Sequence, residues 1–334
     1  MKRIARLAAL LVAGLVVVVS LAACGGADTV NGLTATDVVS KSNAAMAAVK
    51  SVSFDGSIEV TLSGDKDKLK NPAGAFLLGA PLSMTMAGGL SQEPLAMDMT
   101  IKTPLAGMVS PGIDSIGERL VGERMYVRLG GEWYAVPGRF GRPTASASPS
   151  VSTEQMLGIL KQAGVDLTTW VQDKKDLETG RFEGHEVYSV TEELDVNAMA
   201  DGLAKLLADP GVFDQLVPGA EKSTQAELEQ VKAEAPKIAE ALKKYLRSAK
   251  VHLLVDTQSF YLHKLSLSAT IDLPKEAGDQ GIDGASFSLT YHLSHFNEAV
   301  HVVRPPHAQP FGKMGPSLFG SAGAAGSGMS LPSL

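Results

Sequence analysis

Apolar and polar residues follow two different periods along the chain. Between residues 34 and 49, apolar side chains recur every three or four positions, and Thr34 or Thr36 can cap the N-terminus of such a helix. From residue 53 onward the period changes to two, so that Phe54 and Ile58 alternate with polar side chains. An alternating segment has one face in a core and the other in water. The sequence therefore predicts an amphipathic helix followed directly by a half-solvated strand.

The same alternation returns in many later segments. They comprise residues 82–86, 95–102, 120–136, 181–190, 251–255, 265–271 and 287–293. Strands of this kind are typical of antiparallel sheets, because parallel strands are usually apolar on both faces. The predicted fold class is α+β, with one large and strongly curved antiparallel β-sheet.

Helical periods interrupt the strands in the second half of the chain. Short helices are expected within residues 153–171, and a longer helical block covers residues 195–246. Pro236 falls inside this block and is expected to kink or end a helix. The Ser- and Pro-rich residues 141–152 predict a loop, and the Pro-, Gly- and Ser-rich residues 305–334 predict a disordered tail.

The first residues have the pattern of an export signal. Basic residues precede an uncharged apolar run, and the small residues before Cys24 suit a cleavage site. Leu-Ala-Ala-Cys followed by two glycines resembles a bacterial lipobox, which implies that Cys24 is acylated, with a chain such as palmitate, and becomes the mature N-terminus. The alternative is an uncleaved anchor helix with an incidental cysteine. We expect a signal peptide at 1–23, a lipidated tether at 24–33, and a lipoprotein on the extracytoplasmic face of the cell membrane.

Composition and charge argue against several classes of function. A formal net charge of −6 disfavours a nucleic-acid-binding protein, because binding to phosphates requires a basic surface. A single cysteine provides neither an internal disulfide nor a cysteine-based zinc site. The sequence contains no nucleophile elbow, Walker A, zincin or dinucleotide-binding motif. We therefore expect no enzyme, no cofactor and no nucleic-acid partner.

Histidines offer one candidate for a metal site. If Thr257 and Gln258 form a two-residue hairpin loop, His252 and His263 stand opposite each other, with Asp256 at the turn. A zinc site usually needs three or four ligands. Solvent-facing histidines are the favoured interpretation, and the sequence predicts no metal site.

The order of the elements resembles that of a known family. The resemblance depends on residues 36–60 after the lipobox, on RFEGHEVYSVTEELD at 181–195, and on the strand-rich segments 251–271 and 287–306. A leading helix, a run of antiparallel strands, a helical insertion and closing strands resemble the LolA-like fold, in particular the LppX/LprG family of envelope lipoproteins. The resemblance spans most of residues 34–304. It implies an incomplete barrel with a helical lid over an apolar cavity that accepts acyl chains.

Methionines on the apolar faces of the predicted strands are candidates for the wall of such a cavity. An unbranched, polarizable side chain adapts to ligands of varied shape, although methionine also fills gaps in ordinary cores. The scarcity of aromatic residues, 10 Phe, 6 Tyr and 2 Trp, favours an interior that is not solidly packed. The candidate cavity residues are Met84, Met86, Met97, Met99, Met125, Val127, Leu203 and Leu206.

These expectations combine into one function and one alternative. The chain is expected to be a membrane-anchored lipoprotein that binds and carries the acyl chains of a lipid or glycolipid in the cell envelope, with a transport-system protein as a further partner. Apolar burial drives such binding, because each buried methylene contributes about 0.8 kcal/mol without a hydrogen bond. The alternative is a non-enzymatic sensor or assembly factor that binds another envelope protein through the same fold.

Overall fold

The computed structural model describes residues 29–69, 78, 81–103, 113–138, 164–165, 167–209, 225–273 and 281–311. The described helices are α2 (Ala35–Ala47), α6 (Val196–Ala208) and α8 (Gln225–Tyr245), with 3-10 turns η1 (Lys66–Lys68) and η2 (Leu167–Trp170). The described strands are β1 (Ser51–Gly64), β2 (Leu82–Gln92), β3 (Leu95–Lys102), β4 (Ser115–Val121), β5 (Arg124–Leu129), β6 (Glu132–Ala135), β7 (Val171–Phe182), β8 (His185–Leu194), β9 (Leu246–Asp256), β10 (Leu262–Asp272), β11 (Ile282–Ser294) and β12 (Gln309–Pro310).

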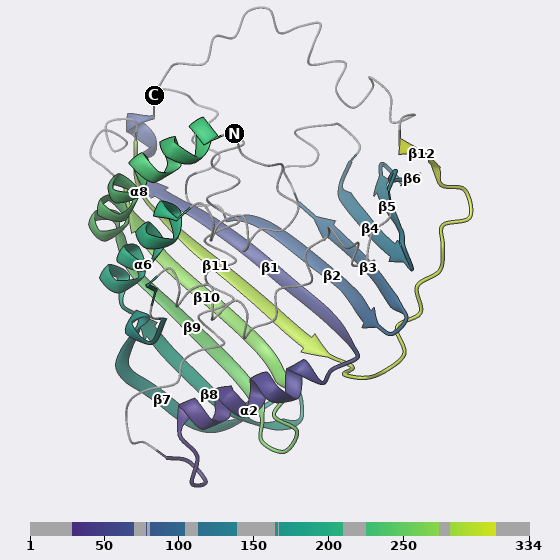
Figure 1. The fold of residues 1–334 in the computed structure, drawn as a ribbon, viewed down its shortest axis with the longest axis horizontal. Helices are drawn as coiled ribbons and strands as arrows, with labels where there is room; N and C mark the ends of the chain where they lie inside the picture. Colours follow the sequence, from purple (N-terminus) through teal and green to yellow (C-terminus); the bar gives the residue numbers. More distant parts are fainter. Residues whose placement is uncertain are drawn as a thin grey trace, which may run out of the picture. The chain divides into compact units, whose positions relative to one another are not determined.

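The described strands belong to one unclosed sheet (Figure 1). Their order across the sheet is β12–β6–β5–β4–β3–β2–β1–β11–β10–β9–β8–β7. The pairings whose register is described are antiparallel, apart from the parallel pair of β12 with β6. The predicted α+β class with one large, mainly antiparallel sheet is therefore confirmed.

The chain divides into two compact units. The first unit comprises Met1–Val49, Gly56–Leu82 and Pro143–Leu293. The second comprises Lys50–Asp55, Ser83–Arg142 and Ser294–Leu334. The three described helices belong to the first unit, whereas the described part of the second unit consists of strands and connecting segments.

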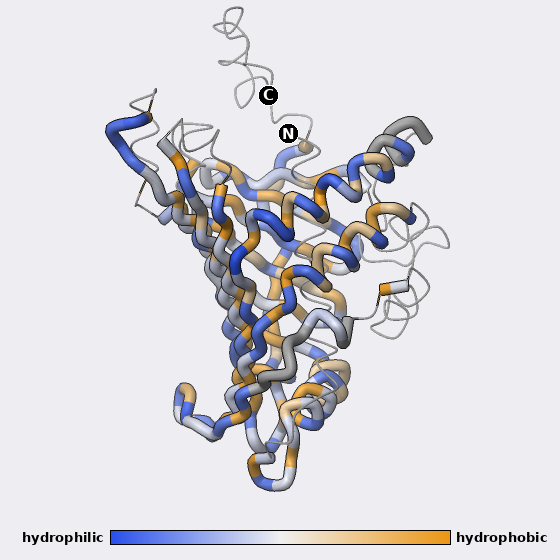
Figure 2. Tube along the Cα trace, turned by 90° about the vertical axis from the view of Figure 1, so that its left-hand side faces the viewer, coloured by the Kyte–Doolittle hydropathy of each residue, from blue (hydrophilic) through white to orange (hydrophobic). Residues whose placement is uncertain are grey.

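In the first unit, helices α2 and α6 pack against the sheet. Hydrophobic and hydrophilic residues alternate along its strands in Figure 2, as the sequence predicted. The apolar positions Val190 of β8 and Val251 and Val255 of β9 are at most 2% exposed. They share one core with Val38 of α2 and Met199 of α6. The two helices therefore cover the hydrophobic core on one face of the sheet in this unit.

In the second unit, strands β2 to β6 pair in chain order as an antiparallel meander. Residues 295–308, which follow β11, contact strands of this unit. The backbone amide of Asn297 donates to the carbonyl of Ser51 at 2.8 Å, and Arg119 donates to the carbonyl of Val303 at 2.9 Å. Strand β12 then pairs with β6, inside the segment that the sequence suggested as a disordered tail.

Two elements of the first unit refine the sequence-based expectation. Helix α8 continues through Pro236, with the buried Ala235 and Ala239 on either side, so the helix does not end at the proline. Of the range 153–171, in which short helices were expected, the structure describes residues 164–165 and 167–171, which contain the 3-10 helix η2 before strand β7 begins at Val171. Strand β7 is the edge of the sheet, and a charged edge strand shows no alternating apolar pattern.

Several predicted segments lie outside the described residues. They include Cys24 with the rest of the signal sequence, the loop at 141–152, and the tail beyond residue 311. At the end of the expected tether, Val30 and Leu33 form a tight turn that packs against the core of the first unit. Among the described residues, no helix is both long and apolar enough to cross a membrane.

Candidate functional site

Strands β2 to β5 bring the predicted methionines onto one face of the sheet in the second unit. In antiparallel strands, directly paired residues point to the same face. Met97 of β3 pairs with Leu90 of β2 and with Leu120 of β4. Leu120 in turn pairs with Met125 of β5. These side chains form an apolar row that crosses the meander.

Further rows run parallel to this one. Met86 pairs with Ile101, which pairs with Ile116 of β4. Between the two rows, Met99 and Val127 each pair with Glu118. We call this surface the methionine face; its apolar residues are Met84, Met86, Leu90, Met97, Met99, Ile101, Ile116, Leu120, Met125, Val127 and Leu129.

The methionine face is only partly covered. Each of its residues is half-buried, and both hydrophobic clusters of buried residues that the structure describes lie in the first unit. The apolar positions of β8 and β9 differ, since α2 and α6 bury them almost completely. Within the described part of the chain, the second unit has no helix that plays the same role. An apolar surface of this kind is characteristic of a binding face.

The remaining two candidate residues, Leu203 and Leu206, lie in the first unit. Leu203 is 5% exposed and packs with Leu207 and Ala235 where α6 meets α8. Leu206 is 5% exposed and belongs to the core beneath α2 and α6. The structure thus brings six of the eight candidates together on the methionine face and places these two in the packing of helix α6.

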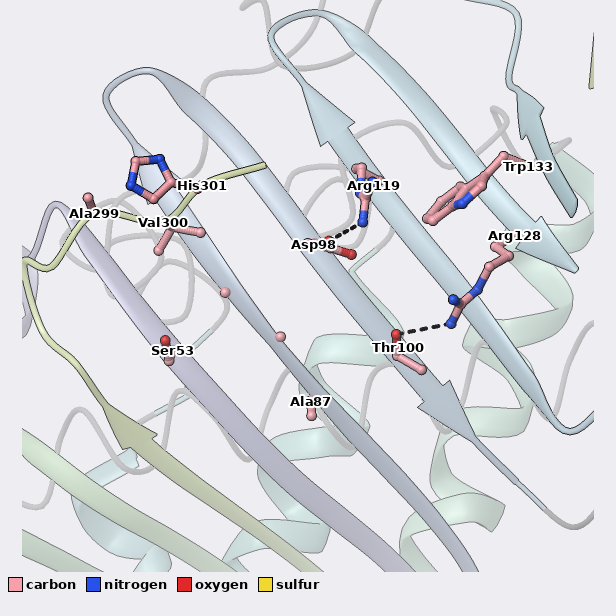
Figure 3. Close-up of a pocket in the computed structure, with 12 residues that line it drawn as sticks. Ser53, Ala87, Asp98, Thr100, Arg119, Arg128, Trp133, Ala299, Val300 and His301 are labelled. Atoms are coloured by element: carbon pink, nitrogen blue, oxygen red, sulfur yellow. Dashed lines mark hydrogen bonds and ion pairs between the residues drawn. The ribbon is translucent and has the colours of Figure 1, made fainter. Parts of the chain in front are cut away.

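The opposite face of the same strands holds a pocket of about 440 Å³ (Figure 3). Asp98 and Arg119 form an ion pair at 2.5 Å, and Arg119 also donates to the carbonyl of Val303. Trp133 lies against both arginines of the pocket, 4.7 Å from Arg119 and 5.6 Å from Arg128, measured from ring centroid to guanidinium carbon. These are cation–π contacts, which orient a guanidinium group over the indole ring.

The lining of this pocket is polar. Arg128 donates to the hydroxyl of Thr100 at 3.4 Å, and no carboxylate within the described residues forms an ion pair with Arg128. The buried Nε of Arg119 has no hydrogen-bond partner among the described atoms. Guanidinium groups in this state suit an anionic group, such as a carboxylate or phosphate. The sequence analysis missed both arginines, although they alternate with the methionine-face positions of β4 and β5.

A third cluster joins His185, Asp256 and His263 in the first unit. Nδ1 of His185 lies 3.3 Å from Oδ2 of Asp256, and Nε2 of His263 lies 3.9 Å from the same oxygen. The centroids of the two imidazole rings are 4.5 Å apart. His252, which the sequence placed opposite His263, instead pairs with Ser266 and contacts the hydroxyl of Ser189 at 3.0 Å.

The hairpin loop explains this correction. Val255 pairs with Leu262, so the connection is longer than the two residues expected. Oδ1 of Asp256 accepts hydrogen bonds from the backbone amides of Gln258 and Ser259, at 2.9 and 2.7 Å, and from the Ser259 hydroxyl at 2.9 Å. An aspartate that bonds to the backbone two and three residues later stabilises a turn of its own. The longer loop shifts His263 away from His252.

The surroundings of His263 and Asp256 determine which of the two side chains is charged at neutral pH. Burial lowers the pKa of His263, and the neighbouring His185 lowers it further, against the opposing effect of Asp256. Burial of Asp256 acts to raise its pKa, but the hydrogen bonds from Ser259 and Gln258 outweigh it and leave the pKa of Asp256 below its usual value. Asp256 is therefore a carboxylate and His263 a neutral imidazole at neutral pH.

Comparison with known proteins adds no relative from which a function could be transferred. No family model matches the chain, and no curated protein sequence matches it significantly.

Proposed function

We propose that the chain is a membrane-anchored lipoprotein that binds the acyl chains of a lipid or glycolipid and carries them in the cell envelope. The observation that supports this most directly is the methionine face. It gathers unbranched, adaptable methionines from β2, β3 and β5 beside the aliphatic side chains of β4, and leaves them half-buried. Acyl chains suit such a surface, since they lose contact with water without requiring directional bonds.

The gain in free energy is large enough for the proposed function. Each methylene that leaves water contributes about 0.8 kcal/mol, so an acyl segment of about ten methylenes gains roughly 8 kcal/mol before the entropic cost of binding. Methionine side chains can repack around chains of different shape, so one face accepts a class of lipids. The proposal therefore concerns acyl chains in general and not one headgroup.

The order of the elements also supports the proposal. Helix α2 precedes strands β1 to β6, helices α6 and α8 stand between β8 and β9, and β9 to β11 close the chain. This is the order on which the resemblance to LolA-like envelope lipoproteins was based. In this proposal the unclosed sheet forms the curved, incomplete barrel that the resemblance implies.

The anchoring half of the proposal depends on the sequence. An export signal that ends in a lipobox-like motif at Cys24 leaves the mature protein attached to the extracytoplasmic face by acyl groups. Replacement of Cys24 by serine, followed by metabolic labelling with a palmitate analogue and membrane fractionation, tests this half separately. We expect loss of label and release from the membrane fraction.

The lipid-binding half predicts a face-specific effect of charge. Met97→Glu adds a carboxylate to the apolar row of the methionine face, beyond the Glu118 that this face already carries, and should clearly reduce copurified or loaded lipid, because a charged group cannot be buried against acyl chains at low cost. Lipid is measured by extraction and mass spectrometry of the purified full chain.

Thr85→Glu is the matched control. Thr85 is exposed on the opposite face of β2, so the same new charge should leave lipid loading unchanged. Circular dichroism and thermal unfolding show whether each variant is folded. The proposal fails if the wild-type chain takes up no lipid, or if Met97→Glu is folded and loads as much lipid as Thr85→Glu.

The polar pocket lined by Arg119 and Arg128 favours one alternative, binding to another envelope protein. Arg128 and the unpaired Nε of Arg119 suit a carboxylate of a partner. In this alternative, Arg128→Ala weakens a one-to-one complex with a defined partner while lipid uptake stays absent in the wild-type chain. The two functions are therefore distinguished by the lipid measurement on the unmodified protein.

A further inference from the structure

Three strand ends of the first unit meet at the cluster of His185, Asp256 and His263. His185 opens β8, Asp256 ends β9, and His263 lies near the start of β10. The pairing of Val187 with Asp256 brings the beginning of β8 alongside the β9–β10 loop. Residues that are far apart in the sequence thus lie within reach of one another.

The distances in this cluster fit a small metal ion. One nitrogen or oxygen atom from each of the three side chains lies within 4.8 Å of the others. A tetrahedral ion with bonds of 2.0–2.1 Å places neighbouring ligand atoms about 3.4 Å apart. The distance of 3.3 Å between His185 and Asp256 already meets this requirement, and the 3.9 Å between His263 and Asp256 needs only a small adjustment. The nitrogens of His185 and His263 lie within 4.8 Å of each other, and rotation of the exposed His185 side chain would bring them closer.

Hydrogen bonds to other groups orient the side chains that would bind the ion. Oδ1 of Asp256 accepts three hydrogen bonds from Gln258 and Ser259, which leaves Oδ2 directed at the two histidines. The His263 ring also hydrogen-bonds to the backbone of Leu293. Metal-binding imidazoles and carboxylates are commonly oriented by such outer contacts, which fix the ring and raise the affinity of the site.

We propose that His185, Asp256 and His263 bind one divalent transition-metal ion, with Zn²⁺ as the ion used to test it. Two imidazoles and a carboxylate are a ligand set that such ions prefer, whereas Ca²⁺ and Mg²⁺ require mostly oxygen ligands. The fourth position is left for water. His185, whose side chain is 52% exposed, gives the ion a route from solvent.

The ion would connect the start of β8 to the β9–β10 hairpin. An ion that binds only the folded chain stabilises it by mass action, so the melting temperature rises with the concentration of Zn²⁺. The site belongs to the first unit and the methionine face to the second, so this inference does not depend on the proposed lipid function.

Calorimetric titration of the untagged full chain with Zn²⁺, after treatment with a chelator, tests the site. We expect one equivalent of Zn²⁺ to bind the wild-type chain, and Mg²⁺ to give no comparable heat. His185→Ala removes an exposed ligand and should weaken binding by at least about tenfold, the lower end of the effect of changing an outer contact. His307→Ala, which removes an exposed histidine of the second unit, should bind as the wild type does.

A spectroscopic readout separates a loss of ligand from a loss of fold. Co²⁺ bound to the wild-type chain should show the intense visible bands of a tetrahedral site, and Asp256→Asn or His185→Ala should reduce them while circular dichroism stays unchanged. If the wild-type chain binds no Zn²⁺ in a one-to-one ratio, the proposal is wrong. It is equally wrong if folded His185→Ala binds Zn²⁺ with unchanged affinity.

Discussion

At the scale of single residues, close neighbours decide what a position tolerates. Gly202 lies in the middle of α6, where glycine costs helix stability relative to alanine. A Cβ atom at Gly202 would lie 2.5 Å from Cζ2 of Trp170, which is 3% exposed in the core of the first unit. The indole ring therefore occupies the space that any other side chain would need.

Gly202→Ala is expected to destabilise the chain. Forcing a methyl group into a packed core costs about 1–3 kcal/mol, whereas the gain in helix propensity returns at most about 1 kcal/mol. Thermal and urea unfolding measure the difference. Gly180→Ala is the control, because no atom lies within 4 Å of a Cβ at Gly180 and its melting temperature should not fall. An increase in stability for Gly202→Ala would contradict this account of the α6 packing.

A second residue-scale prediction concerns pH. Burial, with a smaller effect of Lys264, lowers the pKa of His252 below its ordinary value of 6.5. The unfolded chain therefore takes up this proton at a higher pH than the folded chain does, and the free energy of unfolding falls as pH drops below about 6.5. Urea unfolding with a chelator present, between about pH 7.5 and 5.5, should show this fall. His252→Gln should make it shallower, and an identical slope would contradict the prediction.

At the scale of elements, helix α2 shows which of two possible caps the fold selects. Either Thr34 or Thr36 satisfied the sequence pattern. In the structure the Thr34 hydroxyl accepts from the amide of Asp37 at 3.2 Å, and the Thr34 amide donates to the Asp37 carboxylate at 2.9 Å. The Thr34 hydroxyl also donates to the Asp37 carboxylate at 2.6 Å, and this bond, together with the one from the Thr34 amide, lowers the pKa of Asp37. Thr34 and Asp37 thus form a reciprocal cap at the start of the helix.

Thr34→Ala should destabilise the chain by about 1 kcal/mol, the usual effect of losing an N-cap hydroxyl. Thr36→Ala is the matched control within the same turn, and it should have a clearly smaller effect because Thr36 lies inside the helix. Urea unfolding of both variants measures the difference. Equal losses would show that the reciprocal cap contributes little.

At the scale of the whole molecule, the sheet has two differently covered parts. In the first unit, helices α2 and α6 bury the apolar positions of β8 and β9. In the described part of the second unit, the corresponding apolar positions of β2 to β5 form the methionine face and stay half-buried. The same alternating pattern therefore produces a core in one unit and a candidate binding face in the other. This difference is the reason that the proposed lipid-binding face lies in the second unit.

The sequence by itself determined the local features of this protein. The period of two identified the strands that carry the methionines, because successive side chains of a strand point to opposite faces. A period of three to four residues identified the leading helix α2, and the two periods together predicted the α+β class. The period of two failed at β7, whose charged edge position needs no apolar alternation.

Only the tertiary structure decided which residues meet. The pairing of β2, β3, β4 and β5 aligned the methionines in rows, and the packing of α6 placed Leu203 and Leu206 elsewhere. The cluster of His185, Asp256 and His263 arises from the pairing of β8 with β9 and from a loop that Asp256 lengthens. Local periods contain no information about contacts between distant segments, since strand partners and loop geometry are selected by the packing of the whole chain.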